Sequence, residues 1–226
     1  VAVVSGSGIS EGFAPVAKPS EVTVATYNME RFFDTVNDPG VSDVVLSAVA
    51  LANRLNKASL GIRINLGAPD IIGFQEIENL NVLQLLANKI NLDAAGAYTY
   101  AAYTFEGNDI GGIDVGFLVK NTVTPISVTQ LGFAATYTSP CTGVQETLND
   151  RPPVLFRGSV TKAARTLDLV VIVNHLRSLN GISDITPCAL GTDGQRVRAK
   201  RAAQAEFLAN LIQSEITSNP NVKLIS

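Results

Sequence analysis

The order of apolar segments along the chain constrains its fold more than any other feature. Residues 22–27 alternate β-branched and small side chains, which predicts a strand, and residues 43–58 repeat apolar side chains every three or four positions, which predicts a helix. After Pro69 a short apolar strand is expected at residues 70–75, followed by a second helix at residues 80–91. This strand, helix, strand, helix order favours an α/β arrangement with crossover connections.

The second half of the chain has a different pattern. Strand candidates follow one another with no clear helix between them, so we expect mostly antiparallel pairing there; they cover residues 99–104, 112–119, 123–131, 154–161 and 167–174. Residues 195–216 predict a helix that ends at Asn219-Pro220, and residues 222–226 begin another apolar strand. Residues 1–20 have no period, and we expect a linker or flexible arm before a domain at residues 21–226.

The composition excludes several classes of protein. Hydrophobic residues make up 46% of the 226 residues and charged residues only 16%, which is typical of a packed globular protein and not of a disordered one. The formal net charge of -3 gives no overall basic field, so any contact with nucleic acid has to be local. No apolar run approaches the roughly 20 residues that span a bilayer, so we expect no membrane partner.

The two cysteines, Cys141 and Cys188, lie in segments rich in Thr, Ser, Pro and Gly, where packing of a small apolar side chain is less expected. We expect a disulfide between them; the alternative is two unrelated thiols in a reduced cytosolic protein. The low lysine content and the many Thr, Asn and Ser residues also suit an exported protein. The sequence therefore favours a secreted or periplasmic location.

Polar residues follow three of the apolar strands. They are Asn28, Glu76 and the pair Asn174-His175. Because ligand sites in open sheets form where strand ends converge, these residues are candidates for one site. The carboxylate of Glu76 is a hard oxygen ligand suited to Mg²⁺, although an acid before a helix start also has a purely structural explanation.

The other candidates have structural alternatives as well. Asn28 could cap a turn, and His175, which is the only histidine, could be a hydrogen-bonded structural residue. With Asn174, Arg177 and Ser178, His175 forms a cluster of donors that suits an anionic oxygen.

Further candidates carry a charge at a strand or helix start. Arg151 precedes Pro152-Pro153 and is either a ligand-facing guanidinium or an ordinary surface residue. Asp114 lies in a glycine-flanked strand that allows close approach of a backbone or a ligand. The start of the late helix is basic and could contact phosphates or simply be solvated, through Arg196, Arg198, Lys200 and Arg201.

Four motifs in this order resemble the endonuclease/exonuclease/phosphatase superfamily of deoxyribonuclease I, and the similarity covers residues 21–226. They are Thr26-Tyr27-Asn28, Pro69-Asp70-Ile71-Ile72-Gly73-Phe74-Gln75-Glu76, Arg151-Pro152-Pro153 and Val173-Asn174-His175-Leu176. Three further features are most similar to the bacterial secreted endonuclease branch. They are the Asn-His-Leu-Arg-Ser segment that follows the strand, Cys188, and the helix at residues 196–203. The resemblance implies a four-layer αββα sandwich of two mostly antiparallel or mixed sheets.

The resemblance also implies roles for particular residues. Glu76 would ligate Mg²⁺, or Mn²⁺ or Ca²⁺, with help from Asn28, and His175 would hydrogen-bond the scissile phosphate. Arg151, Arg177 and Ser178 are candidate substrate contacts, with Arg151 alternatively contacting a neighbouring loop. The expected function is a metal-dependent phosphodiester hydrolase, a secreted nuclease acting on DNA or RNA. The alternatives are a phosphatase or sphingomyelinase-like enzyme of the same fold, or a binding module without turnover.

The sequence departs from the family pattern near its end. Family members carry a Gly-Asp-x-Asn box after a strand like residues 222–226, and a later Ser-Asp-His that supplies the general base; neither is present in these 226 residues. We therefore expect the C-terminal strands of the sandwich to be missing. The 226-residue chain alone is expected to lose roughly 10² to 10⁴ in rate from the absence of a general base.

Overall fold

The computed structural model describes residues 12–226, which form two four-stranded sheets and a small hairpin. The first sheet has the strand order β1-β2-β4-β3, with β1 (Val24–Phe32), β2 (Ile71–Ile77), β4 (Asp114–Lys120) and β3 (Tyr100–Thr104). The second has the order β10-β9-β8-β5, with β10 (Leu224–Ile225), β9 (Arg165–Val173), β8 (Val154–Lys162) and β5 (Val123–Gln130). The hairpin pairs β6 (Thr136–Thr138) with β7 (Gln145–Thr147).

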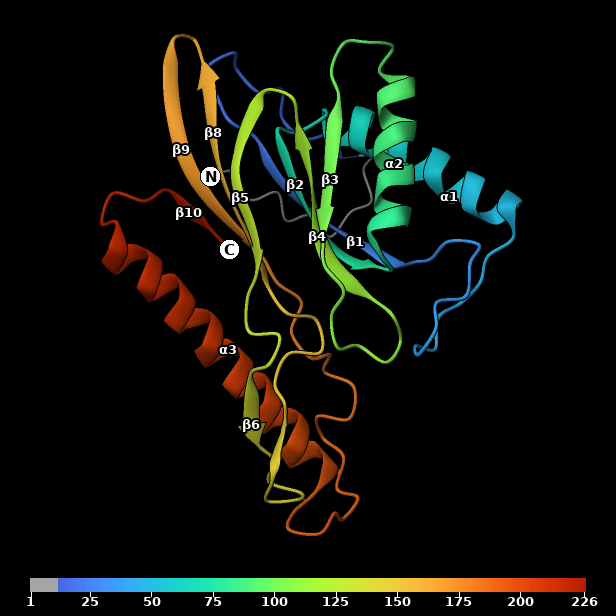
Figure 1. The fold of residues 1–226 in the computed structure, drawn as a ribbon, viewed down its shortest axis with the longest axis vertical. Helices are drawn as coiled ribbons and strands as arrows, with labels where there is room; N and C mark the ends of the chain where they lie inside the picture. The colour runs from blue at the N-terminus through green and yellow to red at the C-terminus, as the bar shows by residue number, and fades with distance from the viewer. Residues whose placement is uncertain (1–11) are drawn as a thin grey trace.

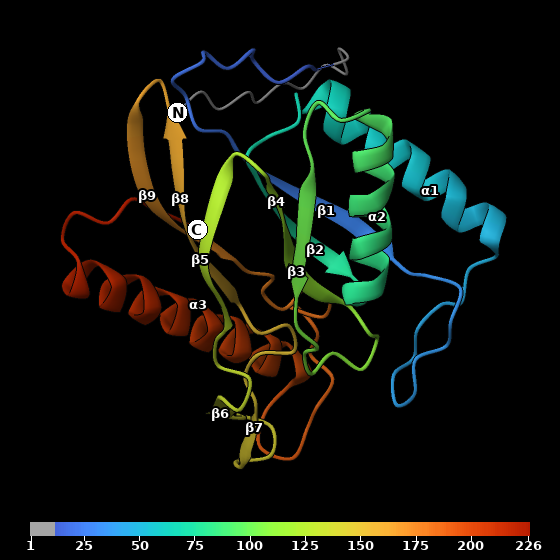
Figure 2. The same ribbon diagram turned by 45° about the horizontal axis from the view of Figure 1, so that its top comes forward.

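Helices cover the outer faces of the two sheets (Figures 1 and 2). On the first sheet lie α2 (Leu80–Asp93) and α1 (Ala48–Leu60), which continues into a π-helical turn, η1 (Gly61–Asn65). On the second lies α3 (Asp193–Ser218), whose Leu208 and Ile212 pack against Ile172. The result is a layered αββα sandwich of mixed sheets, which confirms the fold class predicted from the sequence.

Strand pairing follows the two halves of the chain as expected. The strands β1 and β2 are parallel and are joined through α1, as a crossover connection requires. The pairs β2/β4, β3/β4, β5/β8 and β8/β9 are all antiparallel. The last strand, β10, pairs with β9 in parallel, with Leu224 opposite Val170.

One hydrophobic core lies between the two sheets. Phe117 from the first sheet and Phe156 from the second are fully buried, and their ring centroids are 5.8 Å apart. The Cβ that Gly73 lacks would lie 3.2 Å from Val173, so the two sheets approach closely there. A second core joins Ile72 and Phe74 of β2 to the helices above them. Since β2 is buried on both faces, its near-continuous apolar sequence follows from its central position.

Several element boundaries differ from the sequence prediction because of local capping. The first helix begins at Ala48 and not at residue 43, because the side chain of Ser47 accepts a hydrogen bond from the Ala50 amide at 3.2 Å. Thr192 and Gln195 form a capping box that starts α3 two residues earlier than predicted. The hairpin of β6 and β7 and the turn η1 were not predicted, because such short segments carry no clear periodicity.

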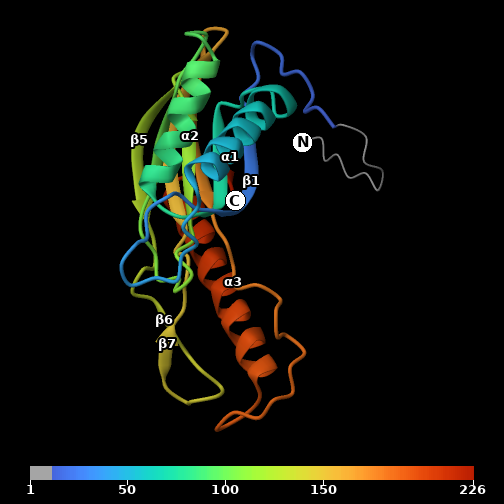
Figure 3. The ribbon, with the colours of Figure 1, turned by 90° about the vertical axis from the view of Figure 1, so that its right-hand side faces the viewer.

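The N-terminal part of α3 extends beyond the ends of the sheets together with the β6–β7 hairpin (Figure 3). A disulfide between Cys141, in the hairpin turn, and Cys188, in the loop before α3, joins these segments and confirms the expected pairing. No helix among residues 12–226 has both the length and the apolar character needed to cross a membrane. Of the predicted arm, residues 1–11 lie outside the described part of the chain, and the Ala14 amide donates to the Asn65 carbonyl at 2.6 Å.

Candidate active site

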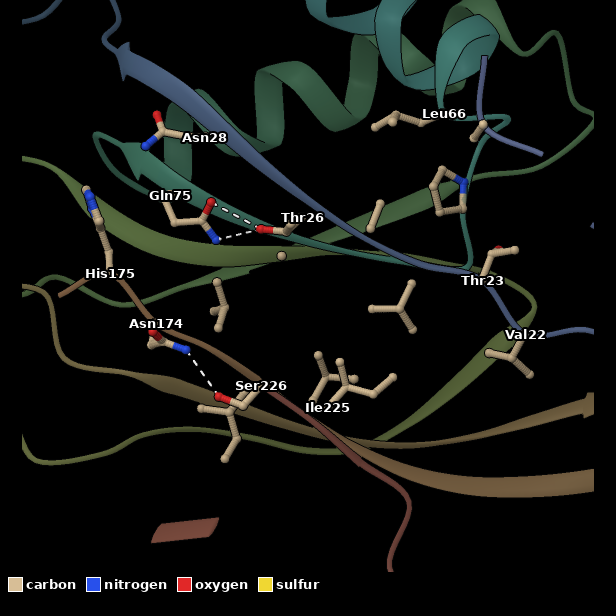
Figure 4. A pocket seen from close by; sticks show the side chains of 18 of the residues that line it. Val22, Thr23, Thr26, Asn28, Leu66, Gln75, Asn174, His175, Ile225 and Ser226 are labelled. Atoms are coloured by element: carbon tan, nitrogen blue, oxygen red, sulfur yellow. Dashed lines mark hydrogen bonds between the residues drawn. The ribbon is translucent and has the colours of Figure 1, made fainter. Parts of the chain in front are cut away.

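Three polar side chains from distant parts of the sequence meet where the registers of β1 and β2 shift and β9 ends. Figure 4 shows two of them, Asn28 and His175. The Asn28 Nδ2 donates a hydrogen bond to Glu76 Oε1 at 3.0 Å. The His175 Nε2 lies 3.7 Å from the same carboxylate oxygen. The structure therefore brings together the acid, the amide and the imidazole that the sequence singled out at strand ends.

The backbone around Glu76 is in an unusual conformation. Glu76 has a φ of 60°, and Glu30 and Arg31 on β1 have φ values of 53° and 59°. The strand register shifts at both places, between Asn28 and Phe32 and between Gln75 and Ile77. Positive φ at a residue other than glycine costs of order 1–3 kcal/mol, and such bulges re-aim side chains next to functional sites. Here the turned backbone brings the Arg31 amide to Glu76 Oε2 at 3.1 Å.

His175 is held as a neutral imidazole. Burial lowers its pKa below the ordinary histidine value, and the nearby Arg151 guanidinium lowers it further, while the carboxylates of Glu76 and Asp109 oppose the shift. Its Nδ1 is buried and has no hydrogen-bond partner among the described residues. At neutral pH the ring therefore carries one N–H and no charge.

Arg151 supports the loop that carries His175. Its Nη1 forms an ion pair with Asp109 Oδ2 at 2.6 Å, and its Nε and Nη2 donate to the carbonyls of His175 at 3.4 Å and Leu176 at 3.3 Å. The side chain is only 8% exposed. Of the two roles considered for Arg151, these contacts match the neighbouring-loop contact, and its donors already have acceptors within the protein.

Arg177 and Ser178, which follow His175, lie further along the same loop. The Arg177 amide donates to Gln204 Oε1 at 2.8 Å, and the exposed Ser178 accepts a hydrogen bond from the Asn180 amide at 3.2 Å. On α3, Lys200 pairs with Asp150 at 2.6 Å, and Arg201 and Arg198 bond to carbonyls of this loop. Arg198 and Arg201 thus fasten the loop after His175 to α3, and Lys200 fastens the segment before β8 to the same helix.

Asp114 is a buried acid at the start of β4. Burial raises its pKa to about 8; the Gly107 amide and Arg151 act against this shift, and Glu106 and Asp109 add to it. A Cβ on Gly107 would lie 2.3 Å from the Asp114 carboxylate, so only glycine allows this approach. The glycine-flanked segment thus brings two parts of the backbone together, and Gly116 likewise lies against the Tyr103 carbonyl.

A cavity of about 970 Å³ opens beside the site, between β1 and β2 of one sheet and β9 and β10 of the other (Figure 4). Its body is lined by apolar side chains of both sheets, including Val24, Val171 and Ile225. Its polar end is formed by Thr26, Asn28, Gln75, Asn174 and His175. Gln75 exchanges hydrogen bonds with Thr26 at 3.1 and 3.3 Å, and Asn174 donates to Ser226 at 3.2 Å.

The donor set suits a partly hydrated divalent cation. Among residues 12–226 no three His, Cys, Asp or Glu side chains surround a common point as metal ligands would. Mg²⁺, however, is usually held by only one or two carboxylates and keeps several waters. The partly exposed Glu76 carboxylate fits such an ion. Asn28 donates its Nδ2 to this carboxylate, and its Oδ1 accepts from the Glu30 amide at 2.8 Å.

Two contributors to this region were not singled out by the sequence analysis. Asp109 anchors Arg151, and the Arg31 amide binds Glu76. Asp109 lies in a polar loop, where its charge alone does not mark it. Arg31 acts through its backbone, which no side-chain pattern reveals.

The chain was compared with known proteins. A family model described as "Endonuclease/Exonuclease/phosphatase family" matches residues 23–226. None of the curated proteins matches the chain. Among solved structures, TDP2 from C. elegans has a TM-score of 0.51 at 15% identity, covering 90% of this chain and 45% of its own.

A truncated form of C. elegans TDP2 has a TM-score of 0.50 at 17% identity, covering 90% of this chain and 59% of its own. The chain thus spans about half the length of the structures it matches. At this level of identity the structural likeness shows the fold alone.

Proposed function

Because this chain belongs to the endonuclease/exonuclease/phosphatase family, we propose that its Asn28, Glu76 and His175 form the phosphate-reacting centre of a divalent-metal-dependent phosphodiester hydrolase. Members of this family hydrolyse phosphodiester or phosphomonoester bonds. The observation that carries the proposal is the meeting of Asn28 Nδ2 and His175 Nε2 at one oxygen of Glu76, at 3.0 and 3.7 Å.

Each of the three side chains has a distinct task in this reaction. Glu76 would hold a divalent cation, which when bound stabilises negative charge on the phosphoryl oxygens, and Asn28 orients the Glu76 carboxylate through its Nδ2. The neutral His175 donates its N–H to a phosphoryl oxygen and stabilises charge that develops there. The Arg31 amide keeps the Glu76 carboxylate oriented through Oε2.

We propose nucleic acid as the substrate class. The Asn-His-Leu-Arg-Ser segment, Cys188 and the helix at residues 196–203 are similar to the secreted endonuclease branch of the family. The net charge of -3 requires that phosphates be bound locally and not by a general field. Arg31 is exposed, its backbone amide binds Glu76, and its guanidinium lies 5.4 Å from the centre of the Phe33 ring. Arg177 and Ser178 follow His175 on the same loop and extend this surface.

We propose that the protein works in an oxidising compartment, either secreted or periplasmic. The support is the disulfide between Cys141 and Cys188, because such bonds persist mainly outside the reducing cytosol.

Hydrolysis and binding should be measured together, because the chain holds a single histidine and turnover by these residues alone is expected to be slow. The substrates are plasmid DNA, RNA, bis(p-nitrophenyl) phosphate as a diester and p-nitrophenyl phosphate as a monoester. We expect Mg²⁺-dependent cleavage of diesters that EDTA removes, and Mn²⁺ binding that Glu76→Gln abolishes. Glu206→Gln, an exposed acid on α3, is the matched control and should retain both. Preference for the monoester, or unchanged Mn²⁺ binding in Glu76→Gln, would contradict the proposal.

A further inference from the structure

The backbone of β1 leaves its ladder with β2 at one place beside the candidate centre. Pairing runs up to Asn28 and resumes at Phe32, so the ladder skips residues 29–31, which we call the β1 bulge. Within the bulge, Glu30 and Arg31 have φ values of 53° and 59°. Because backbone N–H and C=O groups are paired almost everywhere in native proteins, the polar groups of the β1 bulge require partners outside the ladder.

The amides of the β1 bulge bond to side chains of the candidate centre. The Glu30 amide donates to Asn28 Oδ1 at 2.8 Å, and the Arg31 amide donates to Glu76 Oε2 at 3.1 Å. Asn28 Nδ2 in turn donates to the other Glu76 oxygen at 3.0 Å. The orientation of the Glu76 carboxylate therefore depends on the backbone conformation of the bulge.

The carbonyls of the β1 bulge all bond to one arginine of α1, Arg54. Its Nη2 donates to the carbonyls of Met29 at 2.9 Å and Glu30 at 2.7 Å. Its Nη1 donates to the Arg31 carbonyl at 2.8 Å. The guanidinium carbon also lies 5.3 Å from the centre of the buried Phe32 ring. One side chain thus takes up the three carbonyls of the segment that the ladder skips.

The guanidinium of Arg54 is committed to the backbone and not to an acid. None of the ion pairs formed by residues 12–226 includes Arg54. A guanidinium presents its N–H donors in a rigid planar fork, which a lysine cannot reproduce. Positive φ at a residue other than glycine costs of order 1–3 kcal/mol, and the β1 bulge has two such residues in succession. The hydrogen bonds from Arg54 offset this cost and hold the bulge in one conformation.

We propose that Arg54 is a positioning residue of the phosphate-reacting centre, acting on Asn28 and Glu76 through the peptide groups of the β1 bulge. The Met29 carbonyl and the Glu30 amide belong to one peptide group, and the Glu30 carbonyl and the Arg31 amide belong to the next. Arg54 binds the carbonyl of each group, while the amide of each group binds the centre. Bonding at the carbonyl also polarises the peptide group and strengthens its amide as a donor. The inference rests on the proposed function of this centre.

The test measures hydrogen exchange of the Arg31 amide by NMR and the affinity for Mn²⁺, in the full chain and in three variants. In Arg54→Ala we expect this amide to exchange at least about 10-fold faster and Mn²⁺ to bind about 10-fold more weakly, as when other partners that orient a metal ligand are lost. Arg54→Lys should give intermediate values. Arg63→Ala is the matched control, because Arg63 is a partly buried arginine of the adjoining η1 that bonds to Ser59 and Asp93. It should keep the wild-type exchange rate and affinity even where it lowers stability.

Two results would overturn the proposal. One is unchanged or tighter Mn²⁺ binding in Arg54→Ala, because loss of a positive charge alone strengthens the binding of a cation. The other is an unchanged exchange rate of the Arg31 amide. If Arg54→Ala does not fold, Arg54→Lys decides by the same two readouts.

Failure of the proposed function gives a different result. In that case Glu76→Gln leaves Mn²⁺ binding unchanged, and the positioning role of Arg54 fails with the centre. If Glu76→Gln abolishes Mn²⁺ binding and Arg54→Ala behaves as the wild type, only the role of Arg54 fails.

Discussion

Glu76 and Glu78 lie two residues apart at the end of the same strand, yet their surroundings are opposite. Glu76 is 21% exposed, its Oε1 accepts from Asn28 and its Oε2 from the Arg31 amide, and His175 Nε2 lies 3.7 Å from Oε1. Glu78 is buried, and burial raises its pKa to about 8, with the Asp34 amide opposing the shift and the acids around it adding to it. The comparison teaches that a partly exposed acid held by donors suits a cation that binds a reacting phosphate, whereas a buried acid among acids suits a structural role.

The largest expected effect is on the rate of diester hydrolysis, when Glu76 and Glu78 are each replaced by glutamine. Glu76→Gln removes the charge that holds the cation, so we expect diester hydrolysis to fall by at least about 100-fold. Because Glu76 is partly exposed, the stability of this variant should change by less than about 1 kcal/mol. Hydrolysis rates and denaturant titrations of the same preparations measure both effects. A Glu76→Gln variant that keeps its hydrolysis rate would contradict the assignment of Glu76 to the reacting centre. A Glu78→Gln variant with the same rate loss and unchanged stability would contradict the structural role of Glu78.

Substitutions of His175 test its role as a hydrogen-bond donor in the exposed centre around Glu76. His175→Ala should lower the diester hydrolysis rate by roughly 10² to 10³ through loss of a donor to the phosphoryl oxygen, and His175→Asn should recover part of it. Since the pKa of His175 is lowered, the ring is neutral across pH 7 to 8, and protonation should affect the rate only on the acidic side. A pH–rate profile of the wild type checks this, and equal rates for the Ala and Asn variants would contradict the donor role.

Arg151 should have a smaller effect on the hydrolysis rate, because it acts by positioning the loop that carries His175. Its guanidinium spans Asp109 and the carbonyls of His175 and Leu176, and a lysine cannot reproduce this set of contacts. We expect Arg151→Lys to lower kcat by about 10-fold with little change in KM, as 1 Å displacements of reacting groups do. In Arg151→Gln, which removes the positive charge, the acidic side of the pH–rate profile should shift toward higher pH, because Arg151 lowers the pKa of His175. A mutant that loses stability but keeps both kcat and the profile would limit Arg151 to a structural role.

Asp114 is a buried acid outside the candidate centre, and it should affect stability and not the hydrolysis rate. Its pKa is about 8 in the folded protein and near 4 when unfolded, so the folded state retains a proton that the unfolded state has lost. Its contribution to stability is therefore present below about pH 4 and declines as the pH rises toward 8, by at most about 5 kcal/mol. Asp114→Asn should flatten this decline between pH 5 and 8 in urea titrations. An equal decline in the variant would show that other groups cause it.

Much of the fold could be predicted from the sequence because the apolar periodicity is strong. The parallel pair β1 and β2 followed from a strand, helix, strand order, and the antiparallel second half followed from strands without intervening helices. Elements of three residues, such as β6 and β7, and the start of α1 were not predicted, because they depend on a turn or on the Ser47 cap and not on a period.

The candidate site was predictable only in part. Asn28, Glu76 and His175 stood out because a polar residue directly after an apolar strand has no packing explanation. The positive φ values of Glu30, Arg31 and Glu76 depend on how the two strand ends pack together, and no residue type marks them. Glu78 and Asp43 were not singled out either, because burial without donors appears only once the loop from β1 is placed against α2.

The most direct test of the proposed centre is a crystal structure of the protein grown with Mn²⁺, with anomalous scattering used to locate the ion. We predict a peak within coordination distance of a Glu76 carboxylate oxygen, close to Asn28 and on the side facing His175. A structure in which Mn²⁺ avoids Glu76, or in which His175 turns away from an ion bound there, would contradict the account.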